Sequence, residues 1–108
     1  MRYSLAGLRS AYQHESAFRQ ELWLAAILAV IAVALPINLT QLALLWGSLL
    51  IVLITELLNS AVEAVVDRVS FDNHDLAKRA KDMGSAAVFL SLANCLVVWA
   101  LVLWDVFS

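Results

Sequence analysis

The residues best suited to chemistry lie in an apolar stretch in the middle of the 108-residue chain. Residues 42–66 contain two carboxylates, Glu56 and Glu63, and Asp67 follows directly. On a helix these three acids and Asn59 fall within about 80° of one another, and about 10 Å of axial rise separates the two glutamates. Ionisable groups inside a bilayer are costly and usually face a protein interior or a water-filled site. The acidic stripe therefore predicts a functional site.

A structural role for the stripe stays open from the residues alone. Asn59 and Ser60 are residue types that form hydrogen bonds between membrane helices. Two acids two turns apart are harder to explain in this way, because an uncharged amide would bind a neighbouring helix at lower cost.

A second polar cluster, residues 14–21, precedes the first apolar run. Glu15 and Arg19 have the i, i+4 spacing of a surface ion pair. The cluster is expected at the same membrane face as Glu63, however, and carboxylates from two helices are oxygen ligands that Mg²⁺ takes alongside nucleotide phosphates. The spacing leaves both an ion pair and a metal site open.

The third cluster, residues 78–82, contains three cations and one acid. The membrane topology alone accounts for cations here. In a functional interpretation, Lys81 neutralises a phosphate, and Asp82 holds a metal or orients that lysine. The sequence has no Gly-rich phosphate loop of the G-x-x-x-x-G-K-[ST] type and none of the protein-kinase motifs.

The composition requires a membrane around these clusters. Hydrophobic residues make up 63% of the chain, and charged residues make up 15%, against about 25% in an ordinary soluble domain. A soluble domain of this size has no interior large enough for so much apolar surface. The net charge is −2 and there is no basic patch, which excludes nucleic acid as a partner.

We therefore expect an all-α membrane protein with a single domain, residues 1–108. Three apolar runs predict transmembrane helices at about 17–35, 42–66 and 83–105, after an amphipathic surface helix at about 3–16. All Lys and Arg residues lie before the first span or between the second and third. The positive-inside rule then predicts a cytoplasmic N-terminus and 67–82 loop, with the C-terminus outside.

Several motifs resemble the bacterial integral-membrane diacylglycerol kinase family. The two most specific read E-L-L-N-S-A-V-E-A-V-V-D-R from Glu56 and A-K-D-M-G-S-A-A-V from Ala80. Two upstream motifs, Y-S-L-A-G-L-R from Tyr3 and E-S-A-F-R-Q-E from Glu15, fit as well. The resemblance implies a homotrimer in the bacterial inner membrane, with sites shared between protomers. It also implies transfer of phosphate from Mg·ATP to diacylglycerol, giving phosphatidic acid.

The resemblance further implies roles for individual residues. Glu56 would be the general base for the lipid hydroxyl, Glu15 and Glu63 would be the Mg²⁺ ligands, and Asn59 and Asp67 would support them. The nucleotide would contact the two metal ligands together with Tyr3, Asp72, Asn73, His74, Lys81 and Asp82. The lipid would contact the base together with Arg9, Phe18, Arg19, Gln20, Glu21, Ser85 and Trp99.

Two alternatives remain open. Undecaprenol kinase would perform the same chemistry on a polyprenol, although L-N-S at 58–60 and M-G-S at 83–85 resemble the diacylglycerol enzyme more. A non-catalytic assembly subunit or an ion-conducting oligomer would instead use the acidic stripe to line a pore or a proton pathway.

Overall fold

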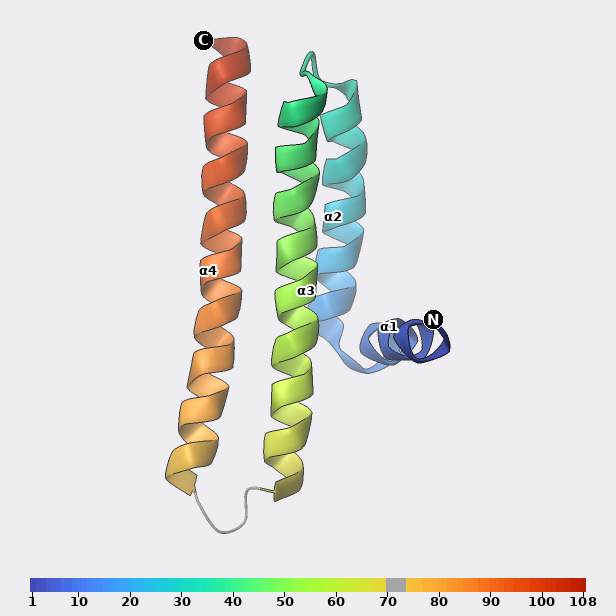
Figure 1. Ribbon diagram of the computed structural model, residues 1–108, viewed down its shortest axis with the longest axis vertical. Helices are drawn as coiled ribbons and strands as arrows, with labels where there is room; N and C mark the ends of the chain where they lie inside the picture. The colour runs from blue at the N-terminus through green and yellow to red at the C-terminus, as the bar shows by residue number, and fades with distance from the viewer. Residues whose placement is uncertain (70–73) are drawn as a thin grey trace.

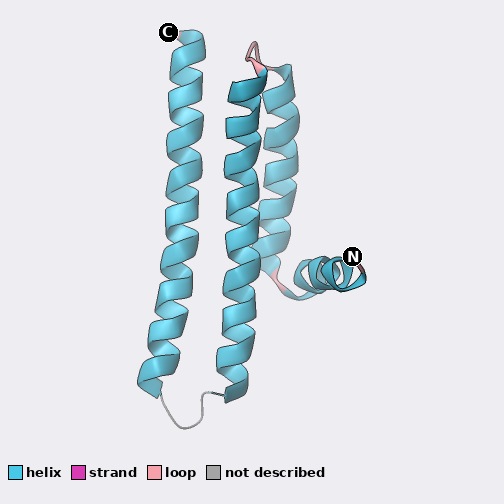
Figure 2. Cartoon of the chain, viewed as in Figure 1, coloured by secondary structure: helices cyan, strands magenta, loops and turns pink. Residues whose placement is uncertain are grey.

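The computed structural model describes residues 1–69 and 74–108, and that part of the chain contains four helices and no strand (Figure 2). The helices are α1 (Arg2–His14), α2 (Ser16–Ala34), α3 (Leu39–Val69) and α4 (His74–Phe107). Figure 1 shows α2, α3 and α4 upright and side by side, with α1 to one side of their lower half and steeply inclined to them. The predicted all-α class, with a separate N-terminal helix and three long helices, is confirmed.

The chain changes direction at Glu15. Its backbone is extended, with φ −115° and ψ 103°, so the helix stops for one residue between α1 and α2. The two helices differ in character: α1 is amphipathic, whereas α2 is apolar around most of its circumference. This difference is typical of a helix on a membrane surface followed by one inside the membrane.

The turn between α2 and α3 is built from polar side chains and proline. Pro36 has no backbone N–H and cannot continue α2. At the start of α3 the side chains of Asn38 and Gln41 each accept a hydrogen bond from the other's backbone N–H, at 2.8 and 3.1 Å. This reciprocal cap satisfies N–H groups that a helix start leaves free.

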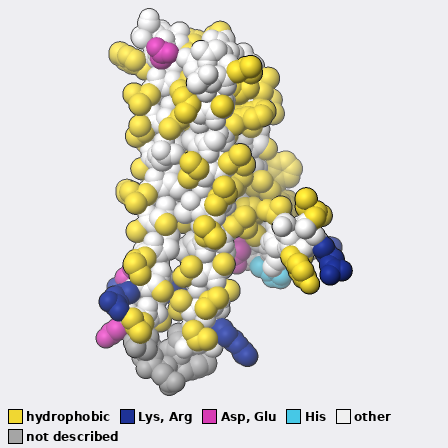
Figure 3. Space-filling model, viewed as in Figure 1, with side chains coloured by type: hydrophobic (Ala, Val, Ile, Leu, Met, Phe, Trp, Pro, Cys, Tyr) yellow, Lys and Arg dark blue, Asp and Glu magenta, His cyan; other side chains and the backbone are white. Residues whose placement is uncertain are grey.

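Three helices are long and apolar enough to cross a membrane: α2, α3 and the Asp75–Phe107 part of α4. α3 has 31 residues and is therefore about 46 Å long, which exceeds the roughly 30 Å of a hydrocarbon core. Figure 3 shows hydrophobic side chains over the visible face of the upright helices, while most charged side chains gather at the lower end and on α1. The protein is an integral-membrane protein.

The packed apolar core lies at the upper end, near the α2–α3 turn. Its buried centre is formed by Ala32, Leu45 and Val102, one from each long helix. Beyond it, Gln41 donates a hydrogen bond to the carboxylate of Asp105 at 2.9 Å. Apolar packing thus ties the three helices at one end, and the polar contacts described next lie toward the other.

Candidate functional site

Glu56 is the most buried acid of the α3 stripe, with 7% of its surface exposed. The carboxyl group of Glu21, on α2, lies within hydrogen-bonding distance of it. One oxygen of Glu21 (Oε2) is buried and has no hydrogen-bond partner among the described residues. Two carboxyl groups in contact repel each other unless a proton or a cation lies between them. The pair is therefore arranged to hold a proton or a cation between the two carboxyl groups.

Glu15 reaches α3 about one turn further along the stripe. Its carboxylate accepts a hydrogen bond of 3.0 Å from the hydroxyl of Ser60. The alternative of an ion pair with Arg19 is wrong, because Arg19 donates instead to the backbone carbonyl of Tyr12 at 2.8 Å and lies over its ring. The extended backbone at Glu15 thus directs this acid inward, toward the stripe.

Glu63 is held by an amide from its own helix. Asn59 donates a hydrogen bond of 3.1 Å from Nδ2 to the Glu63 carboxylate. The other end of the amide faces Gly84 on α4 so closely that a Cβ on the glycine would overlap the Asn59 oxygen. Gly84 therefore allows α4 to approach Asn59, and Asn59 in turn orients Glu63.

The structure brings two predicted metal ligands to neighbouring positions. Ser60, which binds Glu15, lies three residues before Glu63 and so on the same face of α3. Within the described residues, no three His, Cys, Asp or Glu side chains gather into a metal-binding group. Mg²⁺ is usually bound by one or two carboxylates, with phosphate oxygens and water as its other ligands, and less often by protein ligands alone. Two carboxylates are therefore enough for a magnesium site.

Lys81 links α4 to the end of the stripe. Its ammonium group lies 2.7 Å from the carboxylate of Asp67. That hydrogen bond and the charge of Asp67 raise the pKa of Lys81 above its usual value. The expectation that Asp82 orients Lys81 is wrong, because Asp82 pairs with Lys78 of its own helix at 2.7 Å.

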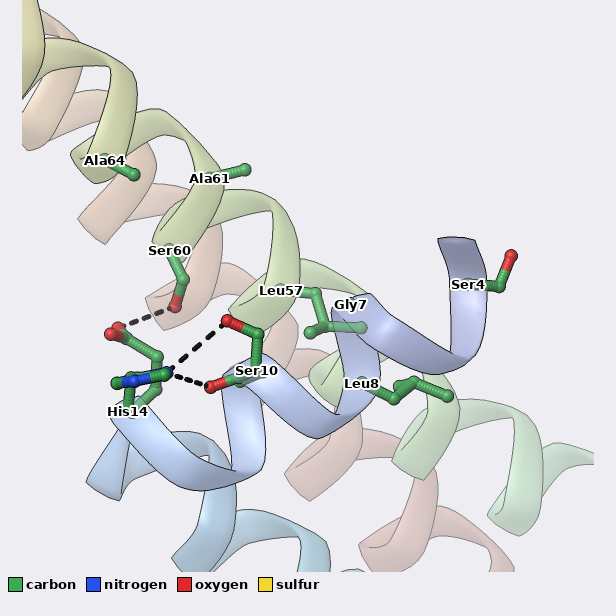
Figure 4. A pocket seen from close by; sticks show the side chains of 11 residues that line it. Ser4, Gly7, Leu8, Ser10, His14, Leu57, Ser60, Ala61 and Ala64 are labelled. Atoms are coloured by element: carbon green, nitrogen blue, oxygen red, sulfur yellow. Dashed lines mark hydrogen bonds between the residues drawn. The ribbon is translucent and has the colours of Figure 1, made fainter. Parts of the chain in front are cut away.

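A cavity of about 610 Å³ opens between α1 and α3 (Figure 4). Ser60 faces His14 and Ser10 across it, and the ring of His14 lies 2.9 Å from the carbonyl oxygen of Ser10. Leu8 and Leu57 supply apolar walls. Because Glu15 also lines the cavity, a ligand there would lie directly beside one of the two predicted metal ligands.

The other predicted site residues that the structure describes do not lie together within one chain. Tyr3 is 82% exposed on α1, whereas Phe18 is buried at 2% exposure and supports the start of α2. Trp99 packs on the upper core cluster, more than a dozen residues along α4 from Ser85. The side chains of Arg9, Gln20 and Ser85 are exposed. Asp72 and Asn73, and the side chain of His74, lie outside the described residues.

The sequence left open a hydrogen bond from Ser60 to a neighbouring helix, and the structure contains one. The hydroxyl of Ser60 binds Glu15, a partner that was not predicted. Gly84 was not given a role, although an isolated glycine in the uncharged 83–104 run can have a packing reason, and here it lies against Asn59.

Comparison with known proteins identifies the family. The sequence profile described as prokaryotic diacylglycerol kinase matches residues 2–103. The chain belongs to the prokaryotic diacylglycerol kinase family. It is 46% identical to the diacylglycerol kinase of Escherichia coli over 98% of this chain and 87% of that protein. It is 50% identical to the diacylglycerol kinase of Pseudomonas aeruginosa over 94% of this chain and 82% of that protein.

A third relative, the diacylglycerol kinase of Haemophilus influenzae, is 47% identical over 95% of this chain and 87% of its own length. The match to the prokaryotic diacylglycerol kinase family therefore spans all four helices and every residue of the stripe. Membership confirms the resemblance noted in the sequence and identifies the chain as an enzyme, a kinase. The non-catalytic alternatives of an assembly subunit or a channel are thereby dropped.

Proposed function

We propose that the protein transfers the γ-phosphate of Mg·ATP to diacylglycerol, giving phosphatidic acid, at the cytoplasmic face of the bacterial inner membrane. The single observation that carries this proposal is the arrangement of four acids along α3. Glu56 is buried beside Glu21, Glu15 meets the same face of the helix at Ser60 about one turn further on, and Glu63 follows about two turns from Glu56. Family membership supplies the reaction class.

The depth of the acids supports a division of labour between them. α1 lies against α3 at the level of Leu57 to Ala64, so a surface helix there puts the interface at that level. From Leu39 to Ser60 the helix rises about 32 Å, close to the roughly 30 Å of a hydrocarbon core. Glu56 then lies just inside the membrane, where a lipid hydroxyl is found, and Glu63 lies on the water side, where Mg·ATP arrives.

In the proposed reaction Glu56 accepts the proton of the lipid hydroxyl. The hydroxyl oxygen forms a bond to the γ-phosphorus, and the bond to the β-phosphate oxygen breaks, releasing ADP. Phosphoryl transfer needs positioning and charge neutralisation rather than covalent catalysis, so few groups suffice. Glu21, in contact with Glu56, is placed to hold the same hydroxyl or the proton it loses.

Glu15 and Glu63 are the proposed ligands of the magnesium ion, which neutralises charge on the phosphates. Lys81 adds a cation, and Asp67 holds it at the end of the stripe. The cavity between α1 and α3 is of a size that accepts small-molecule ligands, which supports a nucleotide beside Glu15. Tyr3, Asp72, Asn73, His74 and Asp82 complete the proposed nucleotide contacts.

We further propose that the working unit is a homotrimer, with the N-terminus and residues 67–82 in the cytoplasm. The described residues of the predicted 67–82 loop are helical, because α3 continues to Val69 and α4 begins at His74. One chain leaves the stripe open to one side and exposes many large apolar side chains along all three long helices. A partner protomer covering this side would complete the site. Of the proposed lipid contacts, Arg9, Gln20, Ser85 and Trp99 lie apart within one chain, which a shared site accommodates.

The assay that tests this function measures label transfer from γ-labelled ATP to lipid in mixed micelles. We expect phosphatidic acid to form with diacylglycerol as acceptor, and transfer to stop when EDTA removes Mg²⁺. Undecaprenol is the comparison acceptor. Faster transfer to the polyprenol than to diacylglycerol would contradict the proposed substrate, and the absence of transfer to either lipid would contradict the kinase function.

Gly84→Ala is expected to lower the affinity of the enzyme for Mg²⁺. The new Cβ would overlap the Asn59 amide, so Asn59 must turn and release Glu63. Loss of a group that orients a metal ligand costs about 10–100-fold in metal affinity. The measurement is a Mg²⁺ titration of transfer activity. Gly47→Ala is the matched control, since nothing lies within 4 Å of its Cβ; an equal response of both variants would refute the role of Asn59.

Lys81→Met is expected to raise the KM for ATP roughly tenfold to a hundredfold, because a charged partner of the phosphates is lost. Arg79→Met removes one positive charge from the same helix, and it serves as the control because Arg79 is exposed and forms no ion pair with the described residues. We expect the KM of this control to stay within about threefold of the wild type. If the two variants change the KM for ATP equally, the proposed contact between Lys81 and the ATP phosphates is wrong.

A further inference from the structure

An apolar groove of about 270 Å³ runs between α2 and α3, on the membrane side of the acids. On the α2 wall Leu22 is followed by the small residues Ala25, Ala26 and Ala29, and the α3 wall consists of Trp46 and three leucines. Small side chains facing large ones leave the hollow between the two helices. The residues that line the groove are all apolar, so it offers no hydrogen bonds to a polar ligand.

The inner end of the groove adjoins the carboxyl pair. Leu22 lines the groove and directly follows Glu21, whose carboxyl group contacts Glu56. On the opposite wall Leu53 lies one turn of α3 away from Glu56. The groove therefore starts at the place where the proposed reaction activates a hydroxyl group, and leads from there into the membrane.

The outer end is closed by Trp46. Its indole N–H donates a hydrogen bond of 3.1 Å to the backbone carbonyl of Ala29. The ring thus bridges from α3 to α2 across the groove, at Ala29, the last α2 residue that lines it. Because the hydrogen bond holds the indole ring in one orientation, the ring blocks the end of the groove more firmly than a freely rotating leucine would.

The dimensions of the groove select its occupant. From Leu22 to Ala29 the helix rises about 10 Å, so the volume of about 270 Å³ corresponds to a cross-section of roughly 27 Å². A helix of a second protomer is about 10–12 Å wide and is too thick to enter. A single hydrocarbon chain fits: with carbon–carbon bonds of about 1.5 Å, about eight carbons in extended form span this length.

We propose that the groove holds the first part of one acyl chain of the lipid substrate, and that Trp46 determines how chain length affects the reaction. The inference rests on the proposed function, because it needs a lipid whose hydroxyl lies at Glu56. A chain of about eight carbons ends at the indole, whereas a longer chain must bend past it into the bilayer. Trp46 is thus a specificity-determining residue for the acceptor.

The test compares kcat/KM for diacylglycerols with eight and with eighteen carbons per chain, in mixed micelles. In Trp46→Ala the groove is open at its outer end, and we expect the ratio of long-chain to short-chain kcat/KM to rise at least threefold. In Trp46→Phe most of the bulk remains and the hydrogen bond is lost, so a smaller rise is expected. An unchanged ratio in Trp46→Ala would overturn the proposal.

Filling the groove supplies a second, independent measurement. Ala26→Phe is expected to raise the KM for both diacylglycerols about tenfold, because the phenyl ring occupies the space of the chain. Ala34→Phe adds the same ring to the same helix outside the groove and is the control. If Ala26→Phe instead changes the oligomeric state in cross-linking, the groove is a contact between protomers and the proposal is wrong. A wild type that transfers phosphate to no lipid would contradict the proposed function itself.

Discussion

Glu56→Gln is expected to lose phosphate transfer by roughly 10²–10⁴-fold, the usual contribution of a general base. The side chain is buried and contacts Glu21. The proposed position of the membrane puts it at the depth of a lipid hydroxyl. Glutamine keeps the size and the hydrogen-bonding capacity of the side chain but cannot accept the proton. The KM for ATP should change little, because Glu56 lies about two turns from Glu63 along α3.

The measurement is kcat for diacylglycerol at saturating Mg·ATP, with purified protein in detergent. Thr55→Val is the matched control, since its hydroxyl binds only the backbone carbonyl of Ile51 in its own helix. We expect this control to retain wild-type kcat. A Glu56→Gln variant with kcat within tenfold of the wild type would show that another group takes the proton.

Glu63→Gln is expected to reduce transfer at millimolar Mg²⁺ by about 10²-fold or more, since a metal that stabilises phosphate charge is worth several kcal/mol. The amide retains one oxygen, but the ligand loses its negative charge and therefore most of its affinity for a hard cation. Unlike Glu56→Gln, this variant should recover part of its activity when the Mg²⁺ concentration is raised.

A titration of initial rate against Mg²⁺ distinguishes the two variants. Asp105→Asn is the control for loss of one acid, because Asp105 lies at the other end of the bundle and binds Gln41. Its half-saturating Mg²⁺ concentration should equal that of the wild type. An unshifted Mg²⁺ curve for Glu63→Gln, with the rate preserved, would remove Glu63 from the metal site.

The sequence predicted the helices well because their signals are local. The apolar runs, Pro36 and the polar residues after it define α2 and the start of α3 without reference to other parts of the chain. The acids of α3 were predicted on one face for the same reason, since the periodicity of a helix fixes their relative directions.

Contacts between elements were predicted less well. Both Arg19 and Ser60 are within reach of Glu15 by spacing or by depth, and only the extended backbone at Glu15 decides for Ser60. Lys78 and Lys81 likewise each have an acid available, and the direction of α4 relative to α3 determines that Lys81 takes Asp67. Which partner each side chain binds depends on how the helices pack against one another. Short sequence motifs do not reveal this packing.

The groove beside the acids shows the same limit. Ala25, Ala26 and Ala29 read as ordinary residues of an apolar helix, and nothing in their spacing predicts that Trp46 would bridge to them. The hollow exists because small residues of α2 face large residues of α3 in one register. That register follows from the turn at Pro36 and the cap formed by Asn38 and Gln41.

The central claim is that the acids of α3 carry out chemistry and do not serve to hold the bundle together. The most direct test measures phosphate transfer and thermal unfolding on the same preparation of the Glu56→Gln/Glu63→Gln double variant. We expect transfer to diacylglycerol to fall to background while the unfolding midpoint stays equal to or above that of the wild type, because one buried and one half-buried charge are removed. Retained transfer together with a lowered midpoint would contradict the claim and assign these acids a structural role.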